Sequence, residues 1–175
     1  MNVSRQLKYS GIILMMFSLF CFAATLLFVP PIHQWANYHQ FSDTREIFGI
    51  PNFMDVISNI LFCLVGMLGF LSLKQKWKEK KLIRAEFLVF FTIFIGIFLT
   101  GIGSAYYHWN PSNANLVWDR IPMTIVFMSL LSLTIMEKVD FNIGFWLLVP
   151  LLIFGISTVW YWHWTDGKPP LKFPR

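Results

Sequence analysis

The sequence has 175 residues, of which 56% are hydrophobic and only 13% are charged, with a mean hydropathy of +0.57. So few charged side chains cannot cover the surface of a water-soluble domain of this size, which argues against that class of protein. The net charge of +5 is concentrated in one basic run, which indicates a cytoplasmic loop of a membrane protein rather than a nucleic-acid surface. That run comprises Lys74, Lys76, Lys78, Lys80, Lys81 and Arg84.

Five apolar segments approach the length of about 20 residues that a helix needs to cross the hydrocarbon core of a bilayer. They run from Gly11 to Val29, Phe53 to Leu73, Phe87 to Tyr107, Ile121 to Met136 and Ile143 to Trp162. We expect the first to be a retained helix, because its long apolar run ends at Pro30 without small residues at the spacing of a signal-peptide cleavage site. The sequence therefore predicts an all-α, multi-pass integral membrane bundle of five spans in one domain, residues 1–175.

The basic residues also predict an orientation. Arg5 and Lys8 before the first span and the basic run after the second should both stay in the cytoplasm. This places the loops around residues 30–52 and 108–120 on the outer side. The partner that follows is the lipid bilayer; no nucleic acid is expected, and no feature specifies an oligomeric state.

Polar residues recur along one face of the third expected helix. Gly96, Thr100, Ser104 and His108 follow one another at intervals of four, so they share one stripe. Because a charge at the centre of a membrane helix costs about 2.5 to 3.5 kcal/mol, such a stripe should face other helices rather than lipid. The stripe therefore marks an interior polar surface.

Two neighbouring segments add polar groups toward the same outer side. Asn52, Asp55 and Asn59 lie on one face of the second expected helix. Asp119 is expected to open the fourth helix, just before Pro122. These residues and the stripe should meet at the outer half of the bundle.

Each of these residues also has a purely structural interpretation. Asp119 can cap a helix whose first turn contains Pro122, and Asn52 can cap the second helix. Ser104 and Thr100 can donate hydrogen bonds to the carbonyl one turn back, and His108 can be an interfacial packing residue. The helical glycines suit close contact between helices; they are Gly66, Gly69, Gly96, Gly101 and Gly103.

Three stretches of the chain together resemble one family. They are the segments from Phe48 to Asn59, from Thr100 to His108 and from Trp118 to Met123. Their pattern, with Ser four residues before His and Asp eleven after it, is similar to that of the ceramidase-like membrane hydrolases, and most of all to bacterial members related to alkaline ceramidases. The resemblance extends from about Phe41 to Thr165.

The resemblance implies a seven-helix bundle that holds one zinc ion through three histidines and cleaves the amide bond of ceramide. It makes His108 a zinc ligand and Ser104 and Asp119 the catalytic pair beside the metal, with Asn52, Asp55 and Asn59 as a supporting polar face. It also implies a bacterial inner-membrane location and a ceramide-like lipid substrate. Calcium is not assigned, because the acidic residues before the second helix match the family's calcium site only loosely.

One departure from the family is large. The other two zinc ligands belong to an H-x-x-x-H pair on the last helix of the family, and this sequence contains no such pair. We therefore expect a C-terminally incomplete domain, whether truncated, frameshifted or made short, whose zinc binding and hydrolysis are impaired. His33, His39 and His163 are the remaining candidates for ligands. The alternative function is a non-catalytic remnant or a receptor-like binding protein without the metal site.

Overall fold

The computed structural model describes residues 34–166 throughout and, before them, the single positions 9, 12, 13, 16, 17, 19, 20, 23, 24 and 28. After a short 3-10 helix, η1, at Ala36–His39, five α-helices follow. They are α2 Phe53–Ser58, α3 Ile60–Lys78, α4 Arg84–Trp109, α5 Asn113–Lys138 and α6 Phe141–Thr165. The all-α class is confirmed for the described part of the chain, in which no strand is present beyond one isolated bridge.

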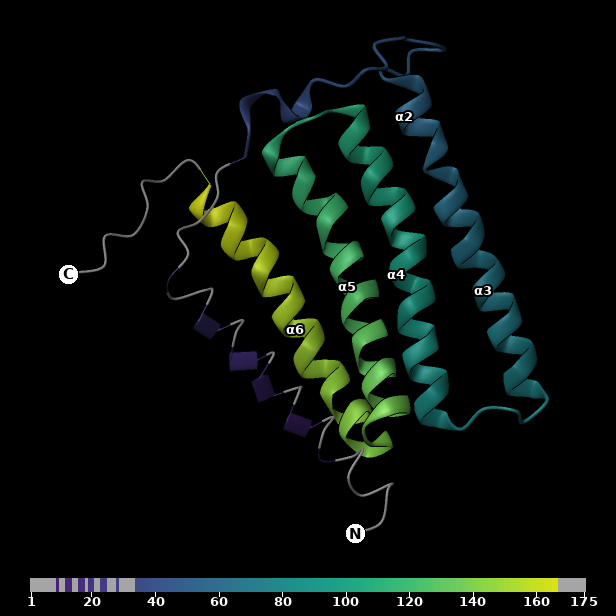
Figure 1. The fold of residues 1–175 in the computed structure, drawn as a ribbon. Helices are drawn as coiled ribbons and strands as arrows, with labels where there is room; N and C mark the ends of the chain where they lie inside the picture. The colour runs from purple at the N-terminus through teal and green to yellow at the C-terminus, as the bar shows by residue number, and fades with distance from the viewer. Residues whose placement is uncertain are drawn as a thin grey trace.

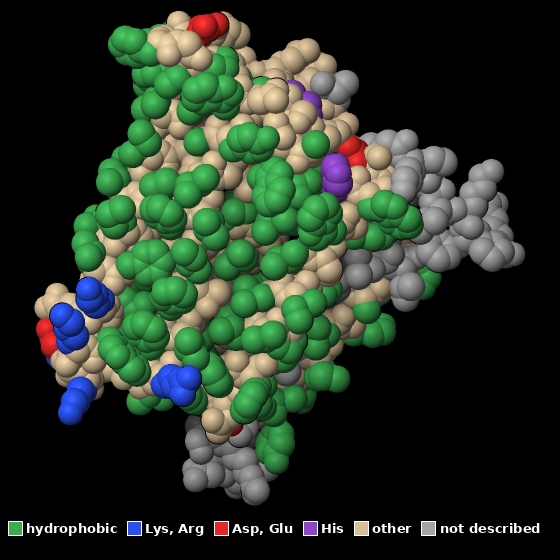
Figure 2. All heavy atoms as spheres, turned by 180° about the vertical axis from the view of Figure 1, so that it is seen from behind, with side chains coloured by type: hydrophobic (Ala, Val, Ile, Leu, Met, Phe, Trp, Pro, Cys, Tyr) green, Lys and Arg blue, Asp and Glu red, His purple; other side chains and the backbone are tan. Residues whose placement is uncertain are grey.

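The helices form an up-and-down row. Helix α4 packs between α3 and α5, and α6 packs against the other side of α5 (Figure 1). The turn between α3 and α4 and the turn between α5 and α6 therefore lie at one end, while α2 and the α4–α5 connection lie at the other. Lys and Arg gather at the first end, histidines at the second, and apolar side chains cover the surface between them (Figure 2).

Four helical segments are long and apolar enough to cross a membrane. They are Phe53–Lys78, which includes α2 and α3, Arg84–Trp109, Asn113–Lys138 and Phe141–Thr165. With the apolar surface around them, these segments make the chain a multi-pass integral membrane protein. The count in the described residues is thus four rather than the predicted five, because the expected span from Gly11 to Val29 falls largely outside them.

The predicted start of the fourth span was wrong. Helix α5 begins at Asn113 rather than near Ile121, because the Ser112 hydroxyl accepts a hydrogen bond of 3.1 Å from the Asn115 N–H and caps the helix. Asp119 therefore lies inside α5 and is not its cap. Pro122 is also interior, and because proline has no N–H it cannot donate to the Trp118 carbonyl one turn back.

The glycines allow the helices to approach closely, as the sequence predicts. A Cβ at Gly103 would collide with the Trp118 carbonyl oxygen, the same carbonyl that Pro122 leaves without a helical donor. A Cβ at Gly101 would lie 2.8 Å from the Asn59 carbonyl oxygen. Helix α4 is thus in backbone contact with α5 on one side and with the junction of α2 and α3 on the other.

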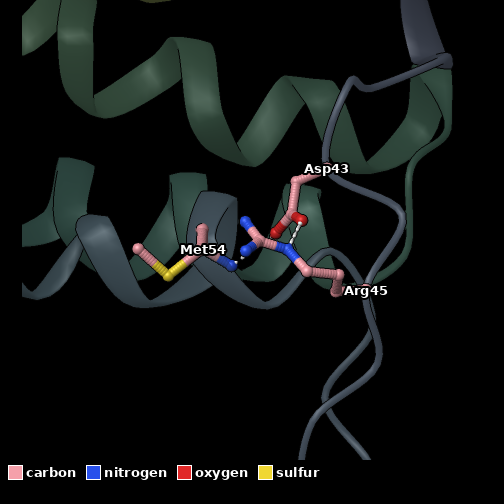
Figure 3. A network of polar contacts seen from close by, with 3 residues as sticks. All are labelled: Asp43, Arg45 and Met54. Carbon is pink, nitrogen blue, oxygen red and sulfur yellow. Dashed lines mark hydrogen bonds and ion pairs between the residues drawn. The ribbon is translucent and has the colours of Figure 1, made fainter.

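Asn52 was expected to cap α2 with its side chain, and this prediction was wrong. Asn52 occupies the N-cap position with a left-handed φ of 47°, but its side chain donates to the His108 carbonyl at 2.8 Å instead of capping α2. The cap comes from Asp43, whose carboxylate accepts from the Met54 N–H at 2.7 Å (Figure 3). The Arg45 side chain, followed by the Met54 N–H, holds the pKa of Asp43 below its ordinary value.

The contact at Gly103 generates a stability prediction. Replacing Gly103 with Ala should lower the free energy of unfolding by about 1 to 3 kcal/mol, because the new methyl group meets fixed backbone of α5. Gly155→Ala is the matched control, since there the new methyl group meets the flexible Met128 side chain. Thermal unfolding in detergent measures both; equal losses for the two variants would contradict the assigned contact.

The orientation of the bundle is a second prediction. In a variant with Cys21 and Cys63 replaced by Ala, a thiol introduced at the exposed Ala114 should react with a membrane-impermeant reagent in intact cells. A thiol introduced at Lys78 should not react, because the basic end is expected to be cytoplasmic. Labelling at position 78 alone would show that the bundle has the opposite orientation.

Candidate active site at one end of the bundle

Ser104, His108 and Asp119 meet at the end of the bundle opposite the turn between α3 and α4. Ser104 is buried on α4, and its side chain lies next to the Asp119 carboxylate on α5. His108, one turn beyond Ser104 on α4, lies close enough to interact electrostatically with the same carboxylate. These two residues and the histidine therefore form one polar group across the α4–α5 contact.

His108 is held firmly but keeps one nitrogen unused. Its Nδ1 atom is buried and has no hydrogen-bond partner. The Phe41 ring lies 4.5 Å from the imidazole, centroid to centroid, and the Asn52 side chain fixes the backbone carbonyl of the same residue. Buried polar atoms without partners are uncommon in proteins, and an unpartnered imidazole nitrogen is a potential metal ligand.

The remaining predicted residues have separate roles. Asn52 reaches the site through the His108 carbonyl, whereas Asn59 is buried against α4 and its amide donates to the Asp55 carbonyl at 2.6 Å. Asp55 contributes that backbone carbonyl, which also accepts a hydrogen bond of 3.2 Å from the Ser58 hydroxyl. Thr100 bonds the Gly96 carbonyl one turn back, as its structural interpretation predicts, while Ser104 instead reaches Asp119.

A second polar network, which the sequence analysis missed, borders the site. His39 contacts the Tyr107 hydroxyl through Nδ1 at 2.9 Å and the Asn113 carbonyl oxygen Oδ1 through Nε2 at 2.7 Å. The Asn113 amide nitrogen donates to the Asp166 carboxylate, which also accepts from the Gln34 N–H at 3.0 Å. Because Oδ1 of Asn113 can only accept, His39 carries its proton on Nε2 and, when neutral, accepts from Tyr107.

This network holds the segment 34–41 across the end of the bundle. Arg120 supports it further, with a hydrogen bond of 2.9 Å to the Gln34 side chain and a guanidinium carbon 4.0 Å from the centre of the Trp162 ring. Phe41, at the end of the segment, lies against His108. Gln34 and Asp166 lie far apart in the chain, so no local sequence pattern predicts these contacts.

Comparison with known families decides the identity of this arrangement. A family model described as Ceramidase matches residues 48–171, which include α2 to α6 and all three residues of the polar group. The chain belongs to the ceramidase family. Searches of curated proteins and of solved structures found no match. The resemblance carried by Ser104, His108 and Asp119 is thereby confirmed at the level of the family.

The family's zinc can be tested against the residues present. His108 fits, because its buried Nδ1 lacks a partner. Residues 34–166 and the few described positions before them contain no group of three His, Cys, Asp or Glu that could hold a metal. Both nitrogens of His39 are engaged, whereas Nδ1 of His163 is buried and unpartnered; His33 lies outside the described residues. In the described part of this ceramidase-family chain, His108 and His163 each have an unpartnered nitrogen, and neither belongs to a complete metal centre.

The segment over the site generates a prediction about local stability. His39→Ala should speed hydrogen exchange at the Tyr38 and Gln40 amides, because it removes both side-chain bonds that tie η1 to α4 and α5. Asn37→Ala is the control, since Asn37 is exposed and uses only its backbone carbonyl in this segment. Unchanged exchange in His39→Ala would show that the network does not hold the segment.

Proposed function

We propose that the protein is a membrane-embedded, zinc-dependent hydrolase that cleaves the amide bond of ceramide-like lipids. The observation that carries the proposal is the placement of Ser104 and Asp119 side by side, next to the unpartnered Nδ1 of His108. A carboxylate, a hydroxyl and a free imidazole nitrogen at one point are the parts that metal-assisted amide hydrolysis uses. Membership of the ceramidase family supports the reaction class.

The position of the group suits an amphiphilic substrate. Its residues belong to the last turns of α4, which ends at Trp109, and the first turns of α5, which begins at Asn113. A ceramide-like lipid carries its amide between a polar head and two apolar chains, so the amide rests at the boundary of water and hydrocarbon. A site at the end of the helices therefore meets the scissile bond without moving the chains out of the bilayer.

The chain's own residues have distinct roles in this proposal. The Asp119 carboxylate accepts a proton from the attacking water and delivers it to the amine nitrogen as the C–N bond breaks. Ser104 lies next to that carboxylate and keeps it oriented. His108 would hold zinc through Nδ1, and a zinc ion supplies Lewis-acid polarisation of the carbonyl. A catalytic zinc needs three protein ligands, so His108 alone would not hold it.

The absence of a complete ligand group in the described residues also favours the alternative, a non-catalytic binding protein of the same family. The two candidates differ in what added ligands would do. A damaged or incomplete enzyme regains activity when the ligands are supplied, whereas a protein adapted to binding does not. Supplying the missing ligands therefore separates the two candidates.

The 175-residue chain should bind zinc weakly and release little or no fatty acid from ceramide. One histidine neither fixes the coordination geometry of zinc nor keeps the ion bound when free zinc is diluted. A chimera that appends the H-x-x-x-H helix of a ceramidase-family relative, with the helix before it, should retain stoichiometric zinc through dialysis against a mild chelator and hydrolyse ceramide. A chimera that folds and holds zinc but has no activity would favour the binding protein.

Variants of that chimera assign the residues. His108→Ala should abolish zinc retention and hydrolysis together, whereas Asp119→Asn should keep zinc and lower the rate of hydrolysis by about 10²- to 10⁴-fold. Ser129→Ala is the control, since Ser129 is a fully buried polar residue of the same helix as Asp119 but donates to the Ile125 carbonyl within α5. Full activity in Asp119→Asn would contradict the proposed proton transfer.

A further inference from the structure

The end of the bundle opposite the site carries a concentrated positive charge. Six basic residues lie on the last turns of α3, the following turn and the start of α4. They are Lys74, Lys76, Lys78, Lys80, Lys81 and Arg84, and together they are called the basic turn here. Figure 2 shows cationic side chains gathered at this end, next to the apolar surface of the helices.

The nearby carboxylates neutralise little of this charge. Glu79 is occupied by Lys81 at 2.6 Å and by the Gln75 amide at 2.8 Å, and the Lys81 ammonium followed by that amide holds its pKa below the ordinary value. Glu86 accepts from the Ile83 N–H at 3.0 Å and caps α4. Among the described residues, Lys81 is the one cation of the basic turn that forms an ion pair. Most of the turn's charge therefore remains available to an external partner.

An aromatic residue fixes the depth of the basic turn. Trp77 is 43% exposed and its ring lies 4.8 Å from the Phe87 ring, at the place where the apolar helices meet the lysines. Tryptophan favours the level of lipid headgroups, and lysine side chains next to it extend their ammonium groups into the same layer. The cations thus stand where the phosphates of a bilayer lie.

The backbone of the turn places lysine where glycine would be easier. Helix α3 ends in a Schellman motif, with the Lys81 N–H donating to the Lys76 carbonyl at 3.0 Å and the Lys80 N–H to the Trp77 carbonyl at 3.1 Å. Lys80 adopts a left-handed φ of 54°, which glycine accepts without strain. Lys80→Gly therefore removes one charge while suiting the backbone, and a loss of binding in that variant cannot be ascribed to misfolding.

We propose that the basic turn is a binding surface for the headgroups of anionic phospholipids in the leaflet that it faces. Clusters of lysine and arginine next to a membrane helix attract anionic lipid, each residue close to the surface strengthening binding by up to about fivefold. A nucleic acid would bind the same charges, but to reach them it would have to enter the headgroup layer in which Trp77 lies. The favoured partner is therefore the lipid.

The test uses the full chain reconstituted in phosphatidylcholine vesicles at physiological ionic strength. A minor fraction of the lipid is brominated close to the ester carbonyl and is either phosphatidylglycerol or phosphatidylcholine. The emission of Trp77 is taken as the difference between the wild-type protein and Trp77→Phe. It should be quenched at least about twofold more by the anionic lipid, because that lipid is enriched around the turn.

Two variants make the result specific. Lys80→Gly should lower the preference for the anionic lipid measurably, and the combination of Lys76→Gln, Lys78→Gln and Lys80→Gly should remove it. Arg45→Gln, which deletes one charge near the opposite end, should leave the preference unchanged. Equal quenching by the two lipids would overturn the proposal. If the protein then also bound an oligonucleotide tightly, the turn would be assigned to nucleic acid.

Discussion

The backbone contact between α4 and α5 at Gly103 is the constraint on which the site depends. Pro122 cannot donate to the Trp118 carbonyl, and Gly103 has no side chain to keep α4 away from it. The next residues in the two helices, Ser104 and Asp119, are thereby brought next to each other. Because lipid is as apolar as the surface of a membrane helix, removing apolar surface from water does not drive these helices together. Close packing at small residues and polar contacts between helices hold them instead. The same contact therefore stabilises the pair of helices and assembles the polar group.

The rest of the described structure arranges charge around this contact. The segment 34–41 is tied to α4, α5 and Asp166 at the end with His108, and the basic turn occupies the other end. Between them the surface is apolar, as a bilayer requires. The proposed hydrolysis of membrane lipids would use this separation, since the polar group would lie at the boundary of the bilayer while the helices remain in the hydrocarbon.

Much of this could be predicted from the sequence, because membrane helices and the stripe from Gly96 to His108 follow periodic patterns. The start of α5 could not, since its first turn contains the polar residues Asn113 and Asn115 and resembles a loop until Ser112 is seen to cap it. The role of Asn52 was missed because its left-handed backbone turns the side chain toward the His108 carbonyl. The His39 network joins residues far apart in the chain, and contacts of that kind depend on the folded arrangement of helices.

The central claim is that Ser104 and Asp119 act as one unit beside His108. A double-mutant cycle of Ser104→Ala and Asp119→Ala, followed by thermal unfolding in detergent, measures their coupling directly. A coupling free energy of about 0.5 kcal/mol or more is expected for two polar side chains in contact inside the bundle, and the pair Ser129→Ala with Asp119→Ala should show none beyond error. Additive effects of Ser104→Ala and Asp119→Ala would contradict the account, because the two side chains would then not interact.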